Sequence, residues 1–326
     1  MPLRPTLRNH NIAPAFRRAL RLYSSDAAAG PLINVVNVPA PNTGHIRVLE
    51  LNRPAARNAI SKALLAALRA EIDDVQTQYT PEGDERPAAG GGEDKMGPTR
   101  ALVLASAVDA SFCAGADLKE RRGFTQEETA QFLSNLRGTF AALSNLPIPT
   151  ISAVASLALG GGLELALCTH FRVLASTATV GLPETRLGII PGAGGTYRLP
   201  ALIGLPRARD LVLTGRRVSA PEAYFLGIAD RLVEVVPEGE GEEGKQGEED
   251  TSIPVRARRA VLSESVRLAT EICEGGPVAV RAGLQAVNWA REEMENAMYQ
   301  RVVRTEDRDE ALLAFKEKRK PVFKGR

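Results

Sequence analysis

The feature that most constrains the fold is a recurrent pairing of short apolar runs with segments of helical periodicity. The runs at 101–106, 150–155 and 171–175 are rich in Ala, Val, Ile and Leu. Between such runs, residues 61–79 and 126–146 place apolar side chains three and four positions apart. Alternation of buried strands with amphipathic helices is typical of sheets that are covered by helices. The pattern therefore predicts an α/β fold.

Local signals mark where several of these elements begin and end. Residues 45–51 (HIRVLEL) alternate polar and apolar side chains, which predicts a further strand. Ser61 is a plausible N-cap for the first helix, and Pro147 ends the second. A third helix is expected from Leu163, directly after three glycines.

The first 28 residues have a different composition. Five arginines occur before Tyr23, whereas the first acidic residue is Asp26. Arg-rich segments without acids are typical of mitochondrial transit peptides, so we expect a leader over 1–28 and a protein of the mitochondrial matrix. The sequence RLYSS at 21–25 resembles a processing site, with cleavage after Tyr23. The alternative is a disordered basic tail with no targeting role.

The rest of the chain divides into a core and a helical end. We expect the core over 29–255, interrupted at 81–97 and 237–252 by Gly-rich and charged loop insertions that are solvated. Residues 256–326 are predicted to be mainly helical, with a basic tail.

Composition excludes several functional classes. A net charge of +2 gives little bulk attraction for nucleic acid. The three cysteines (Cys113, Cys168 and Cys273) are scattered and are expected to be reduced thiols, and three histidines provide little material for a metal site. We therefore expect no metal, and the absence of a long apolar run gives no reason to expect a membrane span.

Two Gly-rich turns stand out as candidate binding elements. One is FCAGADLK at 112–119, after the strand at 101–106, and the other is LGGGLELA at 159–166, between a strand and a helix. A helix that begins near Gly161 would direct free N–H groups toward a ligand. Two such turns together can stabilise an oxyanion, the requirement of thioester chemistry through an enolate. Taken singly, either turn is better explained by close helix–strand packing or a tight turn.

Two carboxylates lie near these turns. Glu164 follows the glycines in the first helical turn, and Glu184 lies in GLPET at 181–185. Hydration of an activated alkene needs a base for water and an acid for the α-carbon, and neighbouring carboxylates have separated pKa values. From spacing alone, however, a helix-end charge for Glu164 and a solvated turn for Glu184 are the better explanations.

Three motifs in order identify a family. FCAGADLKE (112–120), LALGGGLELAL (157–167) and the stretch from LPE at 182 to PGAGGT ending at 196 resemble the enoyl-CoA hydratase/isomerase, or crotonase, family. The resemblance runs from about residue 46 to the C-terminus. It implies a spiral of ββα units with a C-terminal helical trimerisation region, and a homotrimer or dimer of trimers. It also implies an acyl-CoA substrate, of which coenzyme A is a part, and no separate cofactor.

The same resemblance assigns roles to individual residues. The N–H groups of Ala116 and Gly161 form the oxyanion hole, and Glu164 and Glu184 activate water and protonate the α-carbon. Because members with other activities commonly lack one glutamate, hydration is the favoured reaction. Contacts to CoA or to the acyl pocket are assigned to Ala116, Asp117, Leu118, Lys119, Gly192, Phe315 and Lys318. The last two are expected to reach the site of a neighbouring subunit.

Residues 117–121 and 309–325 resemble most closely one mitochondrial branch of the family, which hydrates a dicarboxylic enoyl-CoA. Such a substrate needs a cation near its acyl end, which the sequence does not assign. A short-chain enoyl-CoA hydratase of fatty-acid β-oxidation and an enoyl-CoA isomerase are the alternatives. Departures from the family pattern are Ser156 in place of Gly and His170 in place of Asp; we interpret His170 and the buried Cys113 as structural.

An RNA-binding role is the alternative from another class, because the family contains a member that binds RNA through a lysine-rich helix. The corresponding helix, 61–79, carries Lys62 and Arg69 against three acids. Such a helix would neutralise few phosphates and so release few counterions from a nucleic acid, and we therefore expect no strong nucleic-acid binding.

Overall fold

A computed structural model describes residues 30–87, 96–235 and 252–326. The predicted transit peptide, residues 88–95 of the first predicted insertion and nearly all of the second therefore lie outside the described residues. Residues from Pro31 onward form one compact unit.

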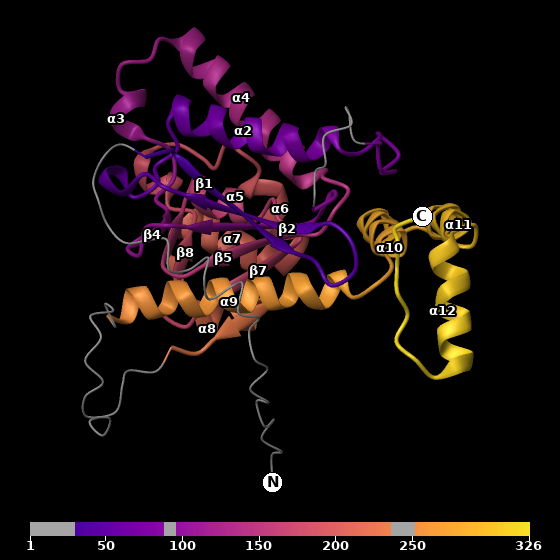
Figure 1. Cartoon of the computed structure of the whole chain (residues 1–326). Coiled ribbons are helices and arrows are strands. Elements are labelled where there is room, and N and C mark those ends of the chain that lie inside the picture. Colours follow the sequence, from indigo (N-terminus) through magenta and orange to yellow (C-terminus); the bar gives the residue numbers. More distant parts are fainter. Residues whose placement is uncertain (1–29, 88–95, 236–251) are drawn as a thin grey trace, which may run out of the picture. The chain divides into compact units, whose positions relative to one another are not determined.

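A six-stranded sheet forms the centre of this unit (Figure 1). Its order is β1-β2-β3-β5-β7-β10; the β1–β2 pair is antiparallel and the other pairs are parallel. The buried runs predicted at 101–106, 150–155 and 171–175 are its inner strands, as expected where both faces are covered. The strands are β1 (Ile33–Pro39), β2 (His45–Leu51), β3 (Thr99–Ser106), β5 (Thr150–Val154), β7 (Phe171–Ala175) and β10 (Arg231–Val233).

A second, four-stranded sheet has the order β4-β6-β8-β9. Each of the pairs β3/β4, β5/β6 and β7/β8 adds one strand to the first sheet and the next strand to the second, and a helical segment follows each pair. This repetition is the predicted series of ββα units, so the predicted fold class is confirmed. The strands are β4 (Ser111–Cys113), β6 (Leu157–Leu159), β8 (Thr179–Gly181) and β9 (Arg217–Ser219).

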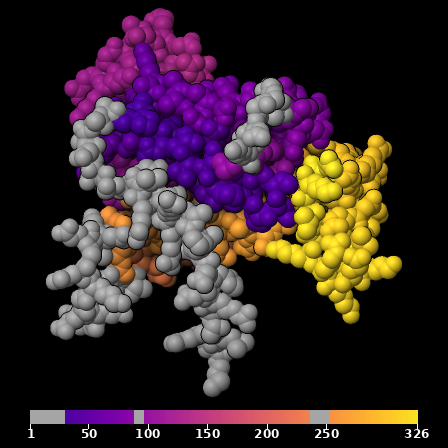
Figure 2. Space-filling model, viewed as in Figure 1, coloured from indigo at the N-terminus to yellow at the C-terminus, as the bar shows by residue number. Residues whose placement is uncertain are grey.

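Two long helices cover one side of the large sheet. Helix α2 (Lys62–Thr77) begins at the predicted N-cap, where the Ser61 hydroxyl accepts a hydrogen bond from Leu64 N at 3.1 Å. Helix α4 (Gln126–Ser144) begins with a capping box and ends before Pro147. The two helices pack against each other, and their atoms form a continuous surface with β1 and β2 in Figure 2.

Shorter helical segments connect the remaining strands. They are η1 (Pro54–Ala56), α3 (Leu118–Arg121), α5 (Gly161–Ala166), η2 (Glu184–Leu187), α6 (Gly195–Ile203), α7 (Leu205–Thr214) and α8 (Ala220–Leu226).

The C-terminal part is helical. Helix α9 (Ile253–Cys273) packs along β3, β5 and β7, on the side of the sheet away from α2 (Figure 1). The expected boundary between 255 and 256 thus falls inside a helix that covers the core. Helices α10 (Pro277–Trp289), α11 (Glu292–Val302) and α12 (Glu306–Glu317) follow.

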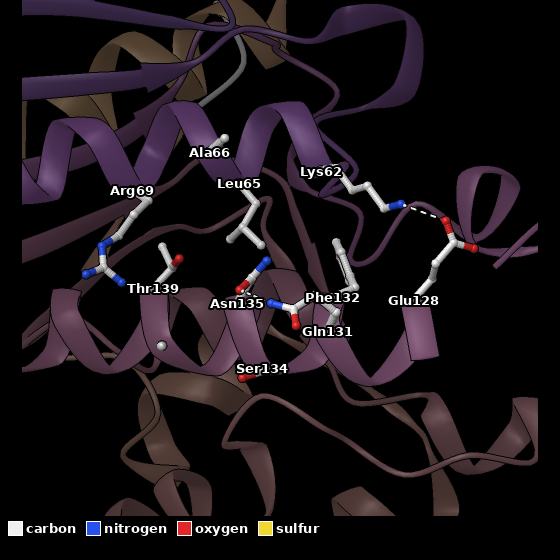
Figure 3. A pocket seen from close by; sticks show the side chains of 11 residues that line it. Lys62, Leu65, Ala66, Arg69, Glu128, Gln131, Phe132, Ser134, Asn135 and Thr139 are labelled. Atoms are coloured by element: carbon white, nitrogen blue, oxygen red, sulfur yellow. Dashed lines mark hydrogen bonds and ion pairs between the residues drawn. The ribbon is translucent and has the colours of Figure 1, made fainter. Parts of the chain in front are cut away.

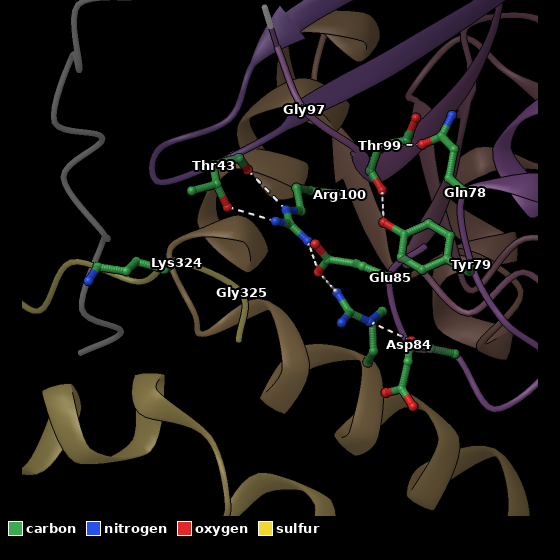
Figure 4. Close-up of polar contacts among 12 residues, drawn as sticks. Thr43, Gln78, Tyr79, Asp84, Glu85, Gly97, Thr99, Arg100, Lys324 and Gly325 are labelled. Atoms are coloured by element: carbon green, nitrogen blue, oxygen red, sulfur yellow. Dashed lines mark hydrogen bonds and ion pairs between the residues drawn. The ribbon is translucent and has the colours of Figure 1, made fainter. Parts of the chain in front are cut away.

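One part of the predicted insertion at 81–97 is tied to the fold rather than being simply solvated. Glu85 forms ion pairs with Arg100 and with Arg281 of α10, and Arg281 Nε donates to Gly83 O at 2.9 Å. Figure 4 shows Arg100 between Glu85 and Thr43. Because Arg100 and Arg281 are both buried, they need such partners, which explains why this segment docks.

Candidate active site

A cavity of about 600 Å³ lies where the two Gly-rich turns meet α3, α4 and the segment around η2. Its lining residues are Ala114, Gly115, Ala116, Leu118, Arg121, Thr129, Leu133, Leu136, Arg137, Gly160, Gly161, Glu164, Pro183, Glu184, Leu187, Gly188, Ile189, Ile190, Gly192 and Ala193. Both predicted oxyanion residues and both predicted catalytic glutamates are among them.

The two predicted oxyanion donors lie side by side. Ile60 N donates to Gly115 O at 2.8 Å and Asp117 N donates to Ile60 O at 3.0 Å. In this parallel bridge the N–H of the intervening residue, Ala116, points away from Ile60. Gly161 opens α5, so its N–H has no helical acceptor. A Cβ built on Gly161 would lie 3.5 Å from Ala116 N, so the two N–H groups share one end of the cavity.

Gly162 explains why the two turns approach so closely. A Cβ built on Gly162 would lie 2.1 Å from Cys113 O, in the strand that leads into the first turn. Only a residue without a side chain permits this contact between α5 and β4. The glycine run is therefore a packing requirement as well as part of the site.

Glu164 is held as a hydrogen-bond acceptor within the cavity. Its side chain is 3% exposed, and its Oε1 accepts from Ala193 N and Gly195 N at 2.8 Å each. Burial raises the pKa of Glu164, while the two N–H donors and the guanidinium groups of Arg198 and Arg137 oppose the rise. The paired donors favour the carboxylate form, which suits a base for water.

Glu184, the first residue of η2, has a different environment. It is 8% exposed, and its Oε2 is buried with no hydrogen-bond partner among the residues described. Burial raises the pKa of Glu184 to about 7, and the charge of Glu164 adds to the rise against a backbone hydrogen bond that lowers it. This group is readily protonated near neutral pH, which suits the proton donor. The two acids therefore have different environments, which fits the two roles expected of them.

The residues predicted to contact CoA are divided by the structure. Leu118 and Gly192 line the cavity, but Asp117 and Lys119 are not in its lining. Asp117 instead caps α3, accepting from Lys119 N at 3.1 Å, and its other oxygen pairs with Arg53 at 2.7 Å. Asp117 therefore holds the turn through Arg53, which no sequence pattern had identified. Contact of Asp117 and Lys119 with CoA stays a prediction.

The two residues of the C-terminal helices that were predicted to contact CoA lie outside the cavity lining. Phe315 on α12 is 86% exposed, and Lys318 ends that helix; neither lines the cavity. Contact with the site of a neighbouring subunit stays a prediction.

Several lining residues were missed from the sequence. Leu133, Leu136 and Arg137 lie on α4, where their periodicity is that of an ordinary amphipathic helix. Arg137 Nε donates to Gly192 O at 2.7 Å, linking α4 to a residue 55 positions later. Only the tertiary structure reveals this contact.

Cys113 is buried as expected, whereas His170 is hydrogen-bonded at only one ring nitrogen, because its Nε2 is buried without a partner among the described residues. His170 Nδ1 lies 2.8 Å from Thr150 Oγ1, and burial lowers its pKa to about 4. Cys113 is fully buried with its Sγ 3.1 Å from Asn58 O, and burial raises the pKa of the thiol to about 12, which fits a structural side chain. The hydroxyl of Ser156 is buried without a partner in the described part of the chain, and nothing in the structure explains this departure.

A second hollow, of about 560 Å³, lies between α2 and α4 (Figure 3). Its two bases are already paired, Lys62 with Glu128 at 3.5 Å and Arg69 with Asp73 at 2.7 Å. This pairing supports the expectation of weak nucleic-acid binding, which stays a prediction.

No cluster of three or more His, Cys, Asp or Glu side chains in 30–87, 96–235 and 252–326 is arranged to hold a metal ion. In the same residues no helix is both long and apolar enough to cross a membrane.

Sequence comparisons identify related proteins. The profile of the enoyl-CoA hydratase/isomerase family matches residues 93–243. The chain is 63% identical to methylglutaconyl-CoA hydratase 1, mitochondrial, of Pyricularia oryzae, over 99% of this chain and 96% of that protein. It is 37% identical to human mitochondrial methylglutaconyl-CoA hydratase, over 94% of this chain and 81% of that protein. The chain is 57% identical to an enoyl-CoA isomerase/hydratase of Zymoseptoria tritici, over 93% of this chain and 91% of that protein.

A solved structure supports the same conclusion. Enoyl-CoA hydratase from Bacillus anthracis matches with a TM-score of 0.73 and 36% identity, over 90% of this chain and all of that one. The chain belongs to the enoyl-CoA hydratase/isomerase family. Within it, the chain is similar over nearly its whole length to proteins named mitochondrial methylglutaconyl-CoA hydratase, the branch that residues 117–121 and 309–325 resemble. Their names also support the predicted hydratase class and the mitochondrial location.

Proposed function

We propose that the protein hydrates the α,β double bond of an enoyl-CoA, with methylglutaconyl-CoA of leucine degradation as its substrate. The observation that carries this proposal is the pair of buried carboxylates, Glu164 and Glu184, in one cavity with two N–H donors. The relatives named methylglutaconyl-CoA hydratase support the choice of acyl group.

The environments of the two acids suggest how the steps are divided. Glu164 takes a proton from water, whose oxygen adds to the β-carbon. The electron pair of the double bond moves to the thioester oxygen, and the N–H groups of Ala116 and Gly161 stabilise the resulting enolate. Glu184 then protonates the α-carbon, and the thioester carbonyl re-forms. Water is added, and no electrons are gained or lost.

Glutamine substitutions test this assignment. Glu164→Gln and Glu184→Gln should each lower kcat by about 10²- to 10⁴-fold, the range for one acid–base group, while CoA-ester binding is retained. Glu128→Gln, an exposed carboxylate outside the cavity, is the control. Loss of absorbance of the enoyl thioester measures turnover. Unchanged kcat in either glutamine variant would refute the mechanism.

Isomerisation is the second candidate, because the Zymoseptoria tritici relative is named isomerase/hydratase. An isomerase moves one proton between carbons without adding water. Product analysis with a β,γ-unsaturated acyl-CoA separates the two: a hydroxyacyl product supports hydration, and a conjugated enoyl product alone supports isomerisation.

Assembly and location complete the proposal. The C-terminal helices expose a set of large apolar side chains that a homotrimer or dimer of trimers would cover: Val287, Trp289, Tyr299, Leu312, Leu313 and Phe315. In such an assembly Phe315 and Lys318 would contact CoA in a neighbouring site. A solution mass equal to one chain would contradict this arrangement.

Within mitochondria, we propose that the protein lies in the matrix. Protease protection in intact and in swollen organelles tests this location.

A further inference from the structure

The charged groups of the cavity are unevenly distributed. Four charged side chains line it, the acids Glu164 and Glu184 and the arginines Arg121 and Arg137, and the other side chains are almost all apolar. The acids lie on α5 and η2, whereas the arginines lie on α3 and α4. An aliphatic acyl chain needs no cation, so the arginines require another explanation.

Arg137 is held at the segment that also anchors Glu164. Its Nε donates to Gly192 O at 2.7 Å, and the next residue, Ala193, donates its N–H to Glu164 Oε1 at 2.8 Å. The guanidinium is close enough to Glu164 to oppose the rise of that pKa. One hydrogen bond thus tethers Arg137 to the segment that holds the catalytic carboxylate, while its side chain stays exposed.

The remaining donors of Arg137 are available. Within 30–87, 96–235 and 252–326, Arg137 has no carboxylate partner, and its one hydrogen bond uses Nε. Both terminal nitrogens thus keep their N–H groups, in the fork that pairs with a carboxylate through two parallel hydrogen bonds. Arg121 differs, because its guanidinium lies over the Phe132 ring, 5.8 Å from the centroid.

We propose that Arg137 binds the distal carboxylate of a dicarboxylic enoyl thioester and so determines acyl specificity. This inference rests on the proposed hydratase function and deepens it. With the thioester oxygen at Ala116 and Gly161 and the double bond beside Glu164, the end of a short acyl chain lies toward Arg137. Methylglutaconyl-CoA carries a carboxylate there, whereas crotonyl-CoA ends in a methyl group.

The test is the ratio of kcat/KM for methylglutaconyl-CoA to kcat/KM for crotonyl-CoA. Arg137→Gln should lower this ratio by about 10- to 100-fold, as expected for loss of a charge-assisted hydrogen bond to substrate. Arg137→Lys should recover part of the loss, since it keeps the charge but not the fork. Arg122→Gln is the matched control: it removes the same charge from an exposed residue beside α3 that does not line the cavity, and the ratio should stay as in the wild type.

Three results overturn the proposal. An unchanged ratio in Arg137→Gln removes Arg137 from acyl recognition. An equal loss for both substrates, with a displaced pH profile, shows that Arg137 acts only by positioning Glu164. A lower ratio in Arg121→Gln, with an unchanged ratio in Arg137→Gln, assigns recognition of the carboxylate to Arg121.

The wild-type protein separates this inference from the proposed function. Turnover of crotonyl-CoA without turnover of methylglutaconyl-CoA would refute the dicarboxylic specificity and leave the hydratase activity intact. Turnover of neither substrate would refute the proposed function itself.

Discussion

The carboxylate of Glu184 lies directly against Gly160: a Cβ built on Gly160 would come within 2.9 Å of Glu184 Oε1. Gly160 also has φ +53° and ψ −125°, a conformation that residues with a side chain rarely adopt. A glycine is thus required at position 160 for two reasons. It permits the backbone conformation before α5, and it leaves room for the Glu184 carboxylate.

Gly160→Ala should therefore displace Glu184. Misplacement of a catalytic group by about 1 Å costs roughly 10²-fold in rate, so we expect kcat to fall by about that factor. Gly227→Ala is the control, because Gly227 has φ +89° but its built Cβ would make only ordinary contact, 3.9 Å from Leu202 O. Equal kcat losses in the two variants would show that backbone strain, not the contact with Glu184, causes the effect.

The pH dependence of turnover follows from the two acids. Hydration needs Glu184 protonated, and because its pKa is raised to about 7, kcat should fall as pH rises through that region. It needs Glu164 ionised, so kcat should also fall on the acid side, below the raised pKa of that group. A kcat profile from pH 5 to 9 measures both limbs. A flat profile up to pH 9 would contradict the role of Glu184 as proton donor.

Titration of Glu184 should lower the free energy of unfolding as pH rises. Because the folded-state pKa lies above the unfolded value, the wild-type protein loses stability as pH rises from about 4.5 to about 7. Glu184→Gln has no charge to bury, so at pH 8 its free energy of unfolding should exceed that of the wild type by up to about 3 kcal/mol. The difference should vanish near pH 4. Denaturant titrations at both pH values measure it.

Glu264 provides the opposite case. Despite burial, hydrogen bonds from Arg267 and Arg231 lower its pKa. Glu264→Gln should therefore reduce stability at pH 7 and converge with the wild type in acid, as its carboxylate would be protonated there. If both glutamine variants changed stability with the same sign at pH 7 to 8, the assigned environments would be wrong.

The docking of residues 83–85 on α10 should depend on Arg281. This side chain is 3% exposed and holds both Glu85 and the Gly83 carbonyl, and Tyr79 lies beneath its guanidinium. Figure 4 shows Glu85 shared with Arg100. Because Arg100 remains as a partner for Glu85, Arg281→Met should cost about 1–3 kcal/mol, the range for an unsatisfied buried group.

Hydrogen exchange measures this effect locally, and protection should fall in residues 79–87 and in α10. Arg304→Gln, an exposed arginine nearby, is the control. Unchanged protection in Arg281→Met would show that the segment is held by other contacts.

The amino-acid sequence by itself determined the α/β class, the inner strands, the Ser61 cap and the motifs that contain Ala116, Gly161, Glu164 and Glu184. These features are local, since periodicity, capping residues and glycine runs act within a few positions of the chain. The predicted solvation of 81–97 failed where buried Arg100 and Arg281 recruit Glu85, a contact between distant segments.

Only the tertiary structure decided how the two glutamates differ. Glu164 receives N–H groups from Ala193 and Gly195, about thirty residues later, whereas the buried Oε2 of Glu184 has no partner in the described residues. The same holds for Asp117, which caps α3 and pairs with Arg53, and for Arg137, which reaches the cavity through Gly192. Burial and hydrogen bonding between distant segments set these properties, and neither is encoded in the spacing of residues along the chain.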